Sequence, residues 1–259
     1  MNGLDEKEIA RLCAEKGCRY TIHTAAETGS TNDELKALAA KGAPDGYAFI
    51  AGSQTAGRGR AGHSFFSPGS GVYLSVLLRP DTPPEQTLHL TAAAGCAVCR
   101  AVEALTDLKA QIKWVNDVYI GGKKVCGILT ESSIIGGKTA WAVVGIGVNI
   151  TEPQGGFPAE IKDRAAALFP AGGGLPPLFR ERFAAELLCA FERQTALSWE
   201  DTLDEYRRRS YLTGKRICLL DGRFATAVGI SENGGLVAEL SGGEKIVIGS
   251  QFSVKETDR

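Results

Sequence analysis

The sequence lacks the motifs that mark several large enzyme classes. Its 259 residues contain no GxxxxGK[ST] loop, which a P-loop nucleotide-binding protein needs to cradle phosphates. They also contain no GxSxG elbow, so a Ser/His/Asp hydrolase is unsupported. The three histidines, His23, His63 and His89, are scattered along the chain and predict no metal site. The missing motifs disfavour P-loop nucleotide-binding proteins and Ser/His/Asp hydrolases. The ligands of any metal ion stay unknown.

An excess of charge of either sign is also absent. Lysine and arginine together number 29, against 30 aspartate and glutamate residues, which gives a formal net charge of −1 at pH 7. Surfaces that bind the phosphate backbone are usually basic. The charge balance therefore argues against a DNA-binding protein.

Targeting and membrane segments are not recognisable either. The longest charge-free stretch, 61–78, contains His63, Pro68, four serines and three glycines, and this composition excludes a membrane helix. The chain opens with MNGLDEKEIARLC, which has no apolar core of the kind found in secretion signals. Seven cysteines without framework spacing then predict reduced thiols in a cytoplasmic protein.

What is present is the composition of a packed globular chain with much glycine. Hydrophobic residues make up 44% and charged residues 23%, which is typical of a folded protein. Glycine supplies 32 residues, about 12% of the chain against the usual 7% or so. Many backbone positions must therefore need positive φ or close approach to a ligand. The length fits one large domain and a small one.

Hydrophobic periodicity predicts a mixed α and β core followed by a small β domain. Thr31 is predicted to cap an amphipathic helix, with Glu34 completing a capping box. Longer helices are predicted over 84–105 and 178–197. Apolar runs predict strands over 47–53, 72–78, 111–115, 124–131 and 140–150. After Thr213, a small all-β barrel is predicted from runs at 216–220, 224–230, 236–240 and 245–248, which are separated by glycine turns.

Glycine and arginine are concentrated in the segment 54–63 (QTAGRGRAGH). Gly57, Gly59 and Gly62 formally match the GxGxxG dinucleotide fingerprint, but that motif opens a helix, and a loop containing Pro68 follows here. Glycines let the backbone approach a ligand, and guanidinium groups pair with phosphate or carboxylate. The pattern predicts a flexible flap over an anionic ligand or, on composition alone, a solvated basic loop.

Three other features have a functional and a structural interpretation. Cys96 and Cys99 lie at core spacing in the predicted helix without a second pair, which favours buried thiols over a redox or zinc site. Lys124 begins an apolar strand and would point its ammonium at a ligand, unless it is a surface lysine beside a turn. Gly145 and Gly147 interrupt a predicted central strand. Glycines at these positions leave space for a ligand or another backbone, or they reflect ordinary sheet packing.

Together these segments resemble the biotin–protein ligase family. Six motifs occur in the order and spacing of the family: Gly29–Asn32 (GSTN), Gln54–Arg60 (QTAGRGR), Phe66–Ser75 (FSPGSGVYLS), Lys113–Asp117 (KWVND), Lys124–Ile128 (KVCGI) and Gly145–Asn149 (GIGVN). Each motif alone is weak, whereas six in order are specific. The resemblance extends from near Tyr20 to the C-terminus.

The resemblance implies an α+β fold and a division of the chain. Residues 20–212 would form a mixed-sheet catalytic domain of the biotin/lipoate ligase type, similar to class II aminoacyl-tRNA synthetases. Residues 213–259 would form a small SH3-like β-barrel. Residues 1–19 would be an N-terminal extension, too short for the helix-turn-helix repressor domain of some members. The expectation is a monofunctional ligase of the form that lacks an N-terminal DNA-binding domain.

The implied reaction has two steps. ATP and biotin, with Mg²⁺, form biotinyl-5′-AMP and pyrophosphate, and the acyl group then passes to a lysine of the biotin carboxyl carrier domain of a biotin-dependent carboxylase. Joining two anions needs fixed cations, and a reactive acyl-adenylate needs a lid against water. Members of the family often dimerise through the catalytic sheet, which favours a homodimer. Neither DNA nor a membrane is an expected partner.

The resemblance also implies roles for individual residues. Lys124, Arg60 and Asp117 form the implied catalytic set, and Thr31 would serve both as helix cap and as a hydroxyl to biotin. The implied biotin-binding residues are Ser30, Thr31, Asn32, Gln54, Gly57, Arg58, Gly59, Arg60, Lys124, Gly127, Gly145 and Gly147. The residues implied for ATP or the adenylate are Arg58, Arg60, Phe65, Trp114, Asn116, Lys124 and Asn149.

The sequence departs from the usual family pattern near two of these motifs. Val115 replaces the proline of Lys-Trp-Pro-Asn-Asp. Ala61 and His63 stand where basic residues often follow the Arg-Gly-Arg triplet, and Phe65 replaces a loop tryptophan. These substitutions bear on adenine stacking and on retention of the intermediate.

Two other functions stay open. A lipoate ligase or octanoyltransferase shares the fold and the acyl chemistry, although the complete Gly-Arg-Gly-Arg and Lys-Trp-x-Asn-Asp set favours biotin. A non-catalytic, biotin-responsive nucleic-acid-binding module would suit the basic loop and the β-barrel. The net charge of −1 and the missing helix-turn-helix count against that module.

Overall fold

A seven-stranded mixed sheet forms the centre of the molecule in the computed structural model, which describes residues 3–252 and 254–257. The strand order is β1-β2-β3-β7-β6-β5-β4. β1 and β2 are parallel, and all other neighbours are antiparallel. The strands are β1 (Thr21–Thr28), β2 (Tyr47–Gln54), β3 (Val72–Leu78), β4 (Gln111–Lys113), β5 (Asp117–Ile120), β6 (Lys123–Ile135) and β7 (Lys138–Val148). The predicted α+β class with a mixed sheet is confirmed.

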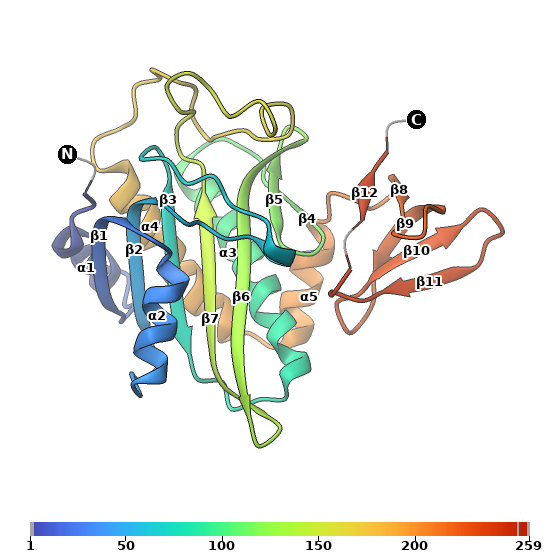
Figure 1. The fold of residues 1–259 in the computed structure, drawn as a ribbon, viewed down its shortest axis with the longest axis horizontal. Helices are drawn as coiled ribbons and strands as arrows, with labels where there is room; N and C mark the ends of the chain where they lie inside the picture. The colour runs from blue at the N-terminus through green and yellow to red at the C-terminus, as the bar shows by residue number, and fades with distance from the viewer. Residues whose placement is uncertain (1–2, 253, 258–259) are drawn as a thin grey trace.

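Helices cover the two faces of this sheet unequally (Figure 1). α3 (Thr87–Leu105) and α4 (Phe179–Thr195) lie on one face, flanked by α1 (Glu6–Glu15) and α5 (Trp199–Arg208). α2 (Thr31–Ala40) lies on the opposite face, against β2, β3 and β7. The segment between β2 and β3 crosses that second face, which α2 leaves partly open.

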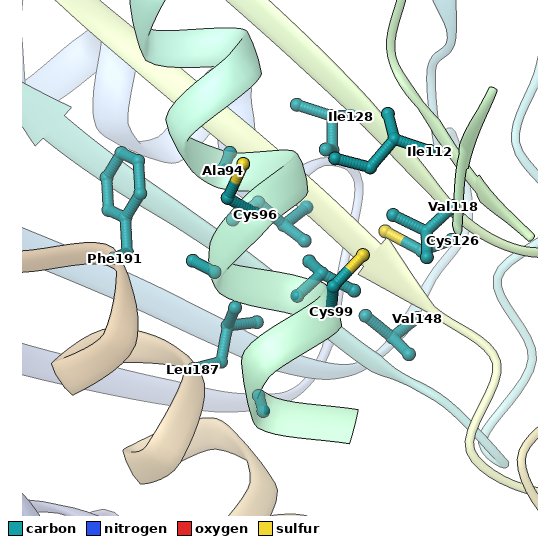
Figure 2. Close-up of a cluster of buried hydrophobic side chains, with 14 of the residues drawn as sticks. Ala94, Cys96, Cys99, Ile112, Val118, Cys126, Ile128, Val148, Leu187 and Phe191 are labelled. Carbon is teal, nitrogen blue, oxygen red and sulfur yellow. The ribbon is translucent and has the colours of Figure 1, made fainter. Parts of the chain in front are cut away.

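α3 is the central helix of the core. Figure 2 shows Cys96 and Cys99 among apolar side chains of the sheet and of α4. Both thiols are free and fully buried, and burial raises the pKa of each, so the prediction of buried thiols is confirmed. With the 3₁₀ turn that precedes it, the segment Pro84–Leu105 is the one helix of the described chain long and apolar enough to cross a membrane. Packing against α4, α5 and β6 accounts for this apolar composition.

The strand predicted over 111–115 is shorter in the structure. β4 ends at Lys113 because the chain turns there and returns as β5, whose Asp117 pairs with Lys113. A second turn at Gly121 and Gly122, with φ of 58° and 82°, then leads into β6. Lys124, at the lysine-rich start of β6, therefore lies level with Gln111 at the start of β4, with Tyr119 of β5 between them.

A separate five-stranded antiparallel sheet follows α5, with the order β11-β10-β9-β8-β12. Its strands are β8 (Arg216–Cys218), β9 (Phe224–Ile230), β10 (Leu236–Leu240), β11 (Lys245–Ile248) and β12 (Lys255–Glu256). The bounds of β9, β10 and β11 match the predicted runs, and an SH3-like module is consistent with this sheet. Figure 1 shows it projecting beside α5 and β4.

Candidate active site

The open face of the large sheet contains a small cavity, with about 30 Å³ of enclosed space and about 330 Å³ when the open space at its mouth is counted. Gly127 pairs with Gly147, and Leu129 pairs with Gly145, along the β6–β7 ladder that forms its floor. The lining comprises Ser30, Thr31, Asn32, Gln54, Arg58, Phe65, Tyr73, Gly127, Leu129, Gly145, Ile146 and Gly147. The cavity thus lies between the start of α2, the loop after β2 and the middle of the sheet.

The glycines of the floor allow side chains to lie directly on the sheet. A Cβ atom on Gly145 would overlap the amide of Asn32. A Cβ atom on Gly147 would lie 2.6 Å from a carbon of the Phe65 ring, and one on Gly127 would lie 2.9 Å from another. Only glycine leaves space for these contacts, so the glycine pattern of the two strands shapes the cavity.

One end of the cavity is a connected set of polar side chains. The backbone N–H and the hydroxyl of Thr31 donate to Gln54 Oε1, at 2.9 and 3.2 Å. Ser75 Oγ lies 2.7 Å from Thr31 Oγ1 and donates to Asn32 Oδ1 at 2.6 Å. Ser30, Thr31, Asn32 and Ser75 are all buried. This end can exchange several hydrogen bonds with a ligand group that both donates and accepts.

The predicted capping role of Thr31 is wrong. Ser30 is the N-cap residue of α2, and Thr31 is its first helical residue. Glu34 does not complete a capping box, because its Oε1 accepts from Thr28 Oγ1 at 2.6 Å. The Thr31 hydroxyl is instead held by Gln54 and Ser75, which aligns it with the cavity.

The two arginines of the Gly-Arg-Gly-Arg segment have different partners. Arg58 lines the cavity, and its NH2 group donates to Asp33 Oδ1 at 2.7 Å and to Glu131 Oε2 at 2.9 Å. Arg60 donates from NH1 to Asn116 Oδ1 at 3.3 Å and from NH2 to the carbonyl oxygen of Ser250. Burial lowers the pKa of the Arg60 guanidinium, and the charge of Asp117 opposes that shift.

The glycines of this segment serve its backbone. The Gly57 carbonyl accepts from the Phe65 N–H at 2.9 Å, and the Gly59 N–H donates to the His63 carbonyl at 2.7 Å. Neither glycine lines the cavity. They close the loop so that Arg58 and Phe65 reach the cavity from one segment.

A second polar group lies beside the cavity at the β5–β6 edge. Lys124 Nζ is 2.7 Å from Asp117 Oδ1 and 5.7 Å from the centre of the Phe65 ring. Asn116 Nδ2 donates to the carbonyl of Ile128 at 2.7 Å, which fixes the side chain that accepts from Arg60. The Phe65 ring therefore separates the polar end of the cavity from a cluster of two cations and one carboxylate.

Two of the residues implied for the nucleotide are held elsewhere. Trp114 is buried, and its indole N–H donates to the carbonyl of Gly234 at 2.9 Å, in a turn of the C-terminal sheet. Asn149 Nδ2 donates to the carbonyl of Ala166 at 2.9 Å. Neither side chain lines the cavity, whereas Phe65 does.

The structure brings together most of the implied biotin-binding set. Eight of those residues line the cavity: Ser30, Thr31, Asn32, Gln54, Arg58, Gly127, Gly145 and Gly147. The others, Gly57, Gly59, Arg60 and Lys124, lie in the loop or at the β5–β6 edge. Within the described part of the chain, no group of three His, Cys, Asp or Glu side chains is placed to hold a metal ion.

Several residues around the cavity were missed by the sequence analysis. Ser75 was detectable as the one polar side chain in the apolar run 72–78, where it is fully buried. Glu131 was detectable as a charge two residues after the apolar run 125–129 of β6. Tyr73, Leu129 and Ile146 gave no signal, because large apolar residues in a central strand look like ordinary core.

Comparisons with known proteins agree with this architecture. A family model described as the biotin/lipoate A/B protein ligase family matches residues 25–149. The bifunctional ligase/repressor BirA of Bacillus subtilis is 34% identical over 242 residues, which cover 87% of this chain and 71% of the relative. The biotin–[acetyl-CoA-carboxylase] ligase of Mycobacterium tuberculosis is 34% identical over 225 residues, which cover 83% of this chain and 80% of the relative.

Solved structures show the same likeness in three dimensions. The biotin protein ligase from Aquifex aeolicus in complex with biotin and ATP superposes with a TM-score of 0.75 at 29% identity. The match covers 91% of this chain and 99% of that one. It therefore includes the large sheet and extends into the C-terminal one.

Proposed function

The chain belongs to the biotin protein ligase family, and on this premise we propose that it is an ATP-dependent ligase for biotin. It would convert biotin to biotinyl-5′-AMP and pass the biotinyl group to a lysine of a biotin carboxyl carrier domain. The observation that carries the proposal is the cavity: a buried polar end, a glycine floor, and cations at its rim and beside it. A cyclic urea with N–H donors and a carbonyl acceptor suits the Ser30, Thr31, Asn32 and Gln54 end, and an aliphatic acid chain suits the apolar Leu129 and Ile146 of the lining.

The first step joins two anions. An oxygen of the biotin carboxylate attacks the α-phosphorus of ATP, the bond from that phosphorus to the β-phosphate oxygen breaks, and pyrophosphate leaves. Negative charge accumulates around the phosphorus in the transition state, where a positioned cation lowers the barrier. Lys124 and Arg60 lie near the same carboxylate, Asp117, and we propose that both contact the phosphoryl oxygens.

Mg²⁺ would arrive with the triphosphate. This ion is usually held by substrate phosphates and one or two carboxylates rather than by an all-protein cage. Asp117, half-buried beside Lys124, is the carboxylate at this edge that fits the requirement. The ion would neutralise phosphate charge and favour departure of pyrophosphate.

The second step transfers the acyl group. The ε-amine of the carrier lysine attacks the acyl carbon, the bond to the phosphate oxygen breaks, and AMP leaves with that oxygen. A lysine ammonium must lose a proton to react, and Asp117 would accept that proton while Asn116 orients the incoming amine. The Phe65 ring and the loop that carries Arg58 and Arg60 would shield the mixed anhydride from water.

The deciding experiment is mass spectrometry of a carrier domain incubated with the full chain, biotin and MgATP. The proposal predicts a mass increase of one biotinyl group on the carrier, which requires ATP and disappears when the acceptor lysine is changed to arginine. A parallel incubation with lipoate addresses the ligase of the same fold. Modification by lipoate and not by biotin would replace the proposal with a lipoate ligase, and no modification by either acid would refute it.

A further inference from the structure

Glu131 connects the two segments that flank the cavity, the start of α2 and the loop after β2. It lies on β6, and because side chains alternate along a strand, it shares a face with Gly127 and Leu129, which line the floor. Its side chain is only 25% exposed. A carboxylate in that place is costly unless it is paired, so its partners indicate why it is there.

Its partners come from two separate segments. Glu131 Oε2 accepts from Asn32 Nδ2 at 2.8 Å and from Arg58 NH2 at 2.9 Å. Glu131 Oε1 accepts from Lys36 Nζ at 3.0 Å. Burial lowers the pKa of the Lys36 ammonium, but its hydrogen bonds to Asp33 and Glu131 outweigh that effect and raise the pKa overall. One carboxylate therefore joins α2 and the arginine loop across the open face of the sheet.

The contact with Asn32 fixes the orientation of a cavity side chain. Asn32 Oδ1 accepts from Ser75 Oγ, while its Nδ2 donates to Glu131 and, at 3.3 Å, to the Leu129 carbonyl. An amide held at both ends cannot rotate by half a turn. The wall next to Gly145 thus presents one defined pattern of donor and acceptor to a ligand.

The contact with Arg58 uses only part of the guanidinium. NH2 is committed to Glu131 and Asp33, and among the described residues Nε and NH1 make no hydrogen bond. Asp33 is 55% exposed, so its pairing with Arg58 is largely screened by water. Glu131 is the more buried of the two acidic partners and holds Arg58 beside Asn32.

We propose that Glu131 is a positioning residue for the acyl substrate, which sets Asn32 and Arg58 in their binding geometry before the substrate enters. This rests on the proposed function, because it takes the ligand of the cavity to be biotin. Glu131 itself would not contact the reacting atoms. Its loss should weaken capture of biotin without changing the rate of the chemical step or the use of ATP.

The test compares Glu131→Gln with Asp33→Asn in the full chain. Both substitutions remove a negative charge next to Arg58 and Lys36, but only the first turns the charged acceptor of Asn32 into a neutral amide. Glu131→Gln should raise the calorimetric Kd and the KM for biotin by about ten- to a hundredfold, the range for losing a hydrogen bond to a charged group. Its kcat for pyrophosphate release and its KM for ATP should stay within about threefold of wild type, and Asp33→Asn should change every value by less than threefold.

Each other outcome has a definite meaning. Unchanged biotin binding in Glu131→Gln, tighter binding, or an equal effect of Asp33→Asn would overturn the inference. A wild-type chain that does not bind biotin would overturn the proposed function and the inference with it. If Glu131→Gln does not fold, Glu131→Asp keeps the charge but is too short to hold both partners, and it should show the same selective rise in KM for biotin. A fall in melting temperature with unchanged KM would mean that Glu131 is merely structural.

Discussion

Lys124 is the single side chain whose loss should affect the proposed chemistry most. Its ammonium lies 2.7 Å from Asp117, at the edge where the phosphates are expected. Removing one preorganised charge-stabilising group costs about 2.7–4 kcal/mol of transition-state energy. Lys124→Ala should therefore reduce biotin-dependent pyrophosphate release by about 10²–10³-fold. Because the ion pair is partly exposed, the free energy of unfolding should change by no more than about 1 kcal/mol.

The neighbouring Lys123 provides the control for this substitution. It is exposed and begins β6 one residue earlier. Lys123→Ala should leave pyrophosphate release near the wild-type value. A Lys124→Ala enzyme that keeps more than about a third of that rate would remove Lys124 from the catalytic residues.

Gly145 tests whether the glycine floor is needed for binding. Gly145→Ala would place a methyl group where the Asn32 amide lies, so Asn32 must move and lose its bonds to Ser75 and Glu131. Overpacking of this kind costs about 1–3 kcal/mol of stability. We expect at least a tenfold rise in the Kd for biotin by calorimetry. Gly229→Ala on β9, where the methyl would enter open space, should change stability by less than about 0.5 kcal/mol and leave the Kd unchanged.

At the residue scale, motifs indicated which side chains gather but not how they are held. The polar end around Thr31 and Gln54 follows from the resemblance, and the structure places both in the cavity lining. The predicted capping role of Thr31 was wrong because a hydroxyl at a helix start can bind either the helix backbone or a side chain from another element. Here it donates to Gln54, which is 23 residues away in sequence. Long-range partners of this kind cannot be read from local spacing.

At the scale of elements, strongly patterned segments were predicted well. β3 and β9 have the predicted bounds, since an apolar or alternating run between turns fixes a strand. β1 was missed because TIHTAAET contains one large aliphatic residue and its burial does not alternate regularly. It is a strand because its backbone groups form hydrogen bonds with β2 in a parallel pair at the edge of the sheet.

The loop between β2 and β3 is the element expected to retain the adenylate. Arg60→Gly removes a charge-assisted contact worth about 1.5–3 kcal/mol and adds glycine freedom that costs about 0.5–1 kcal/mol on closure. It also releases Asn116 and the Ser250 carbonyl from their shared donor. A combined loss of about 3 kcal/mol of binding free energy should speed escape of biotinyl-5′-AMP by roughly 10²-fold.

Escape is measured by labelling of a bystander protein. A streptavidin blot of albumin incubated with biotin, MgATP and Arg60→Gly should show strong labelling, and wild type should show little. Arg60→Lys, which keeps the charge, should give an intermediate signal. Equal and negligible labelling by all three, with Arg60→Gly still releasing pyrophosphate, would show that Arg60 does not retain the intermediate.

At the scale of the whole molecule, the two sheets are joined by specific hydrogen bonds and by a shared hydrophobic cluster. The turn at 232–234 accepts from both neighbouring indoles: Trp114 Nε1 donates to Gly234, and Trp199 Nε1 donates to Glu232 at 2.7 Å. Arg207 Nε also donates to the Ile230 carbonyl at 3.0 Å. Buried residues of the C-terminal sheet such as Ile217 belong to the same continuous cluster as the main core. Sequence patterning located this module but gave no sign of these contacts, because indole donors carry no partner-specific motif.

Deleting the chain after Thr213 tests the predicted division into domains. The large sheet and its helices lie before this point, so we expect a shortened chain that still folds by circular dichroism and still binds biotin. Loss of the contacts with Trp114, Trp199 and Arg207 should lower its melting temperature by about 5–10 °C, as expected for 2–3 kcal/mol in a chain of this size. Use of ATP should weaken more than biotin binding, because Arg60 loses its partner at Ser250. Trp199→Phe in the full chain removes one joining hydrogen bond without removing the sheet, and it should show a small part of the stability loss and none of the ATP effect. An insoluble or unfolded shortened chain would mean that the two sheets form one folding unit and that the division at 213 is wrong.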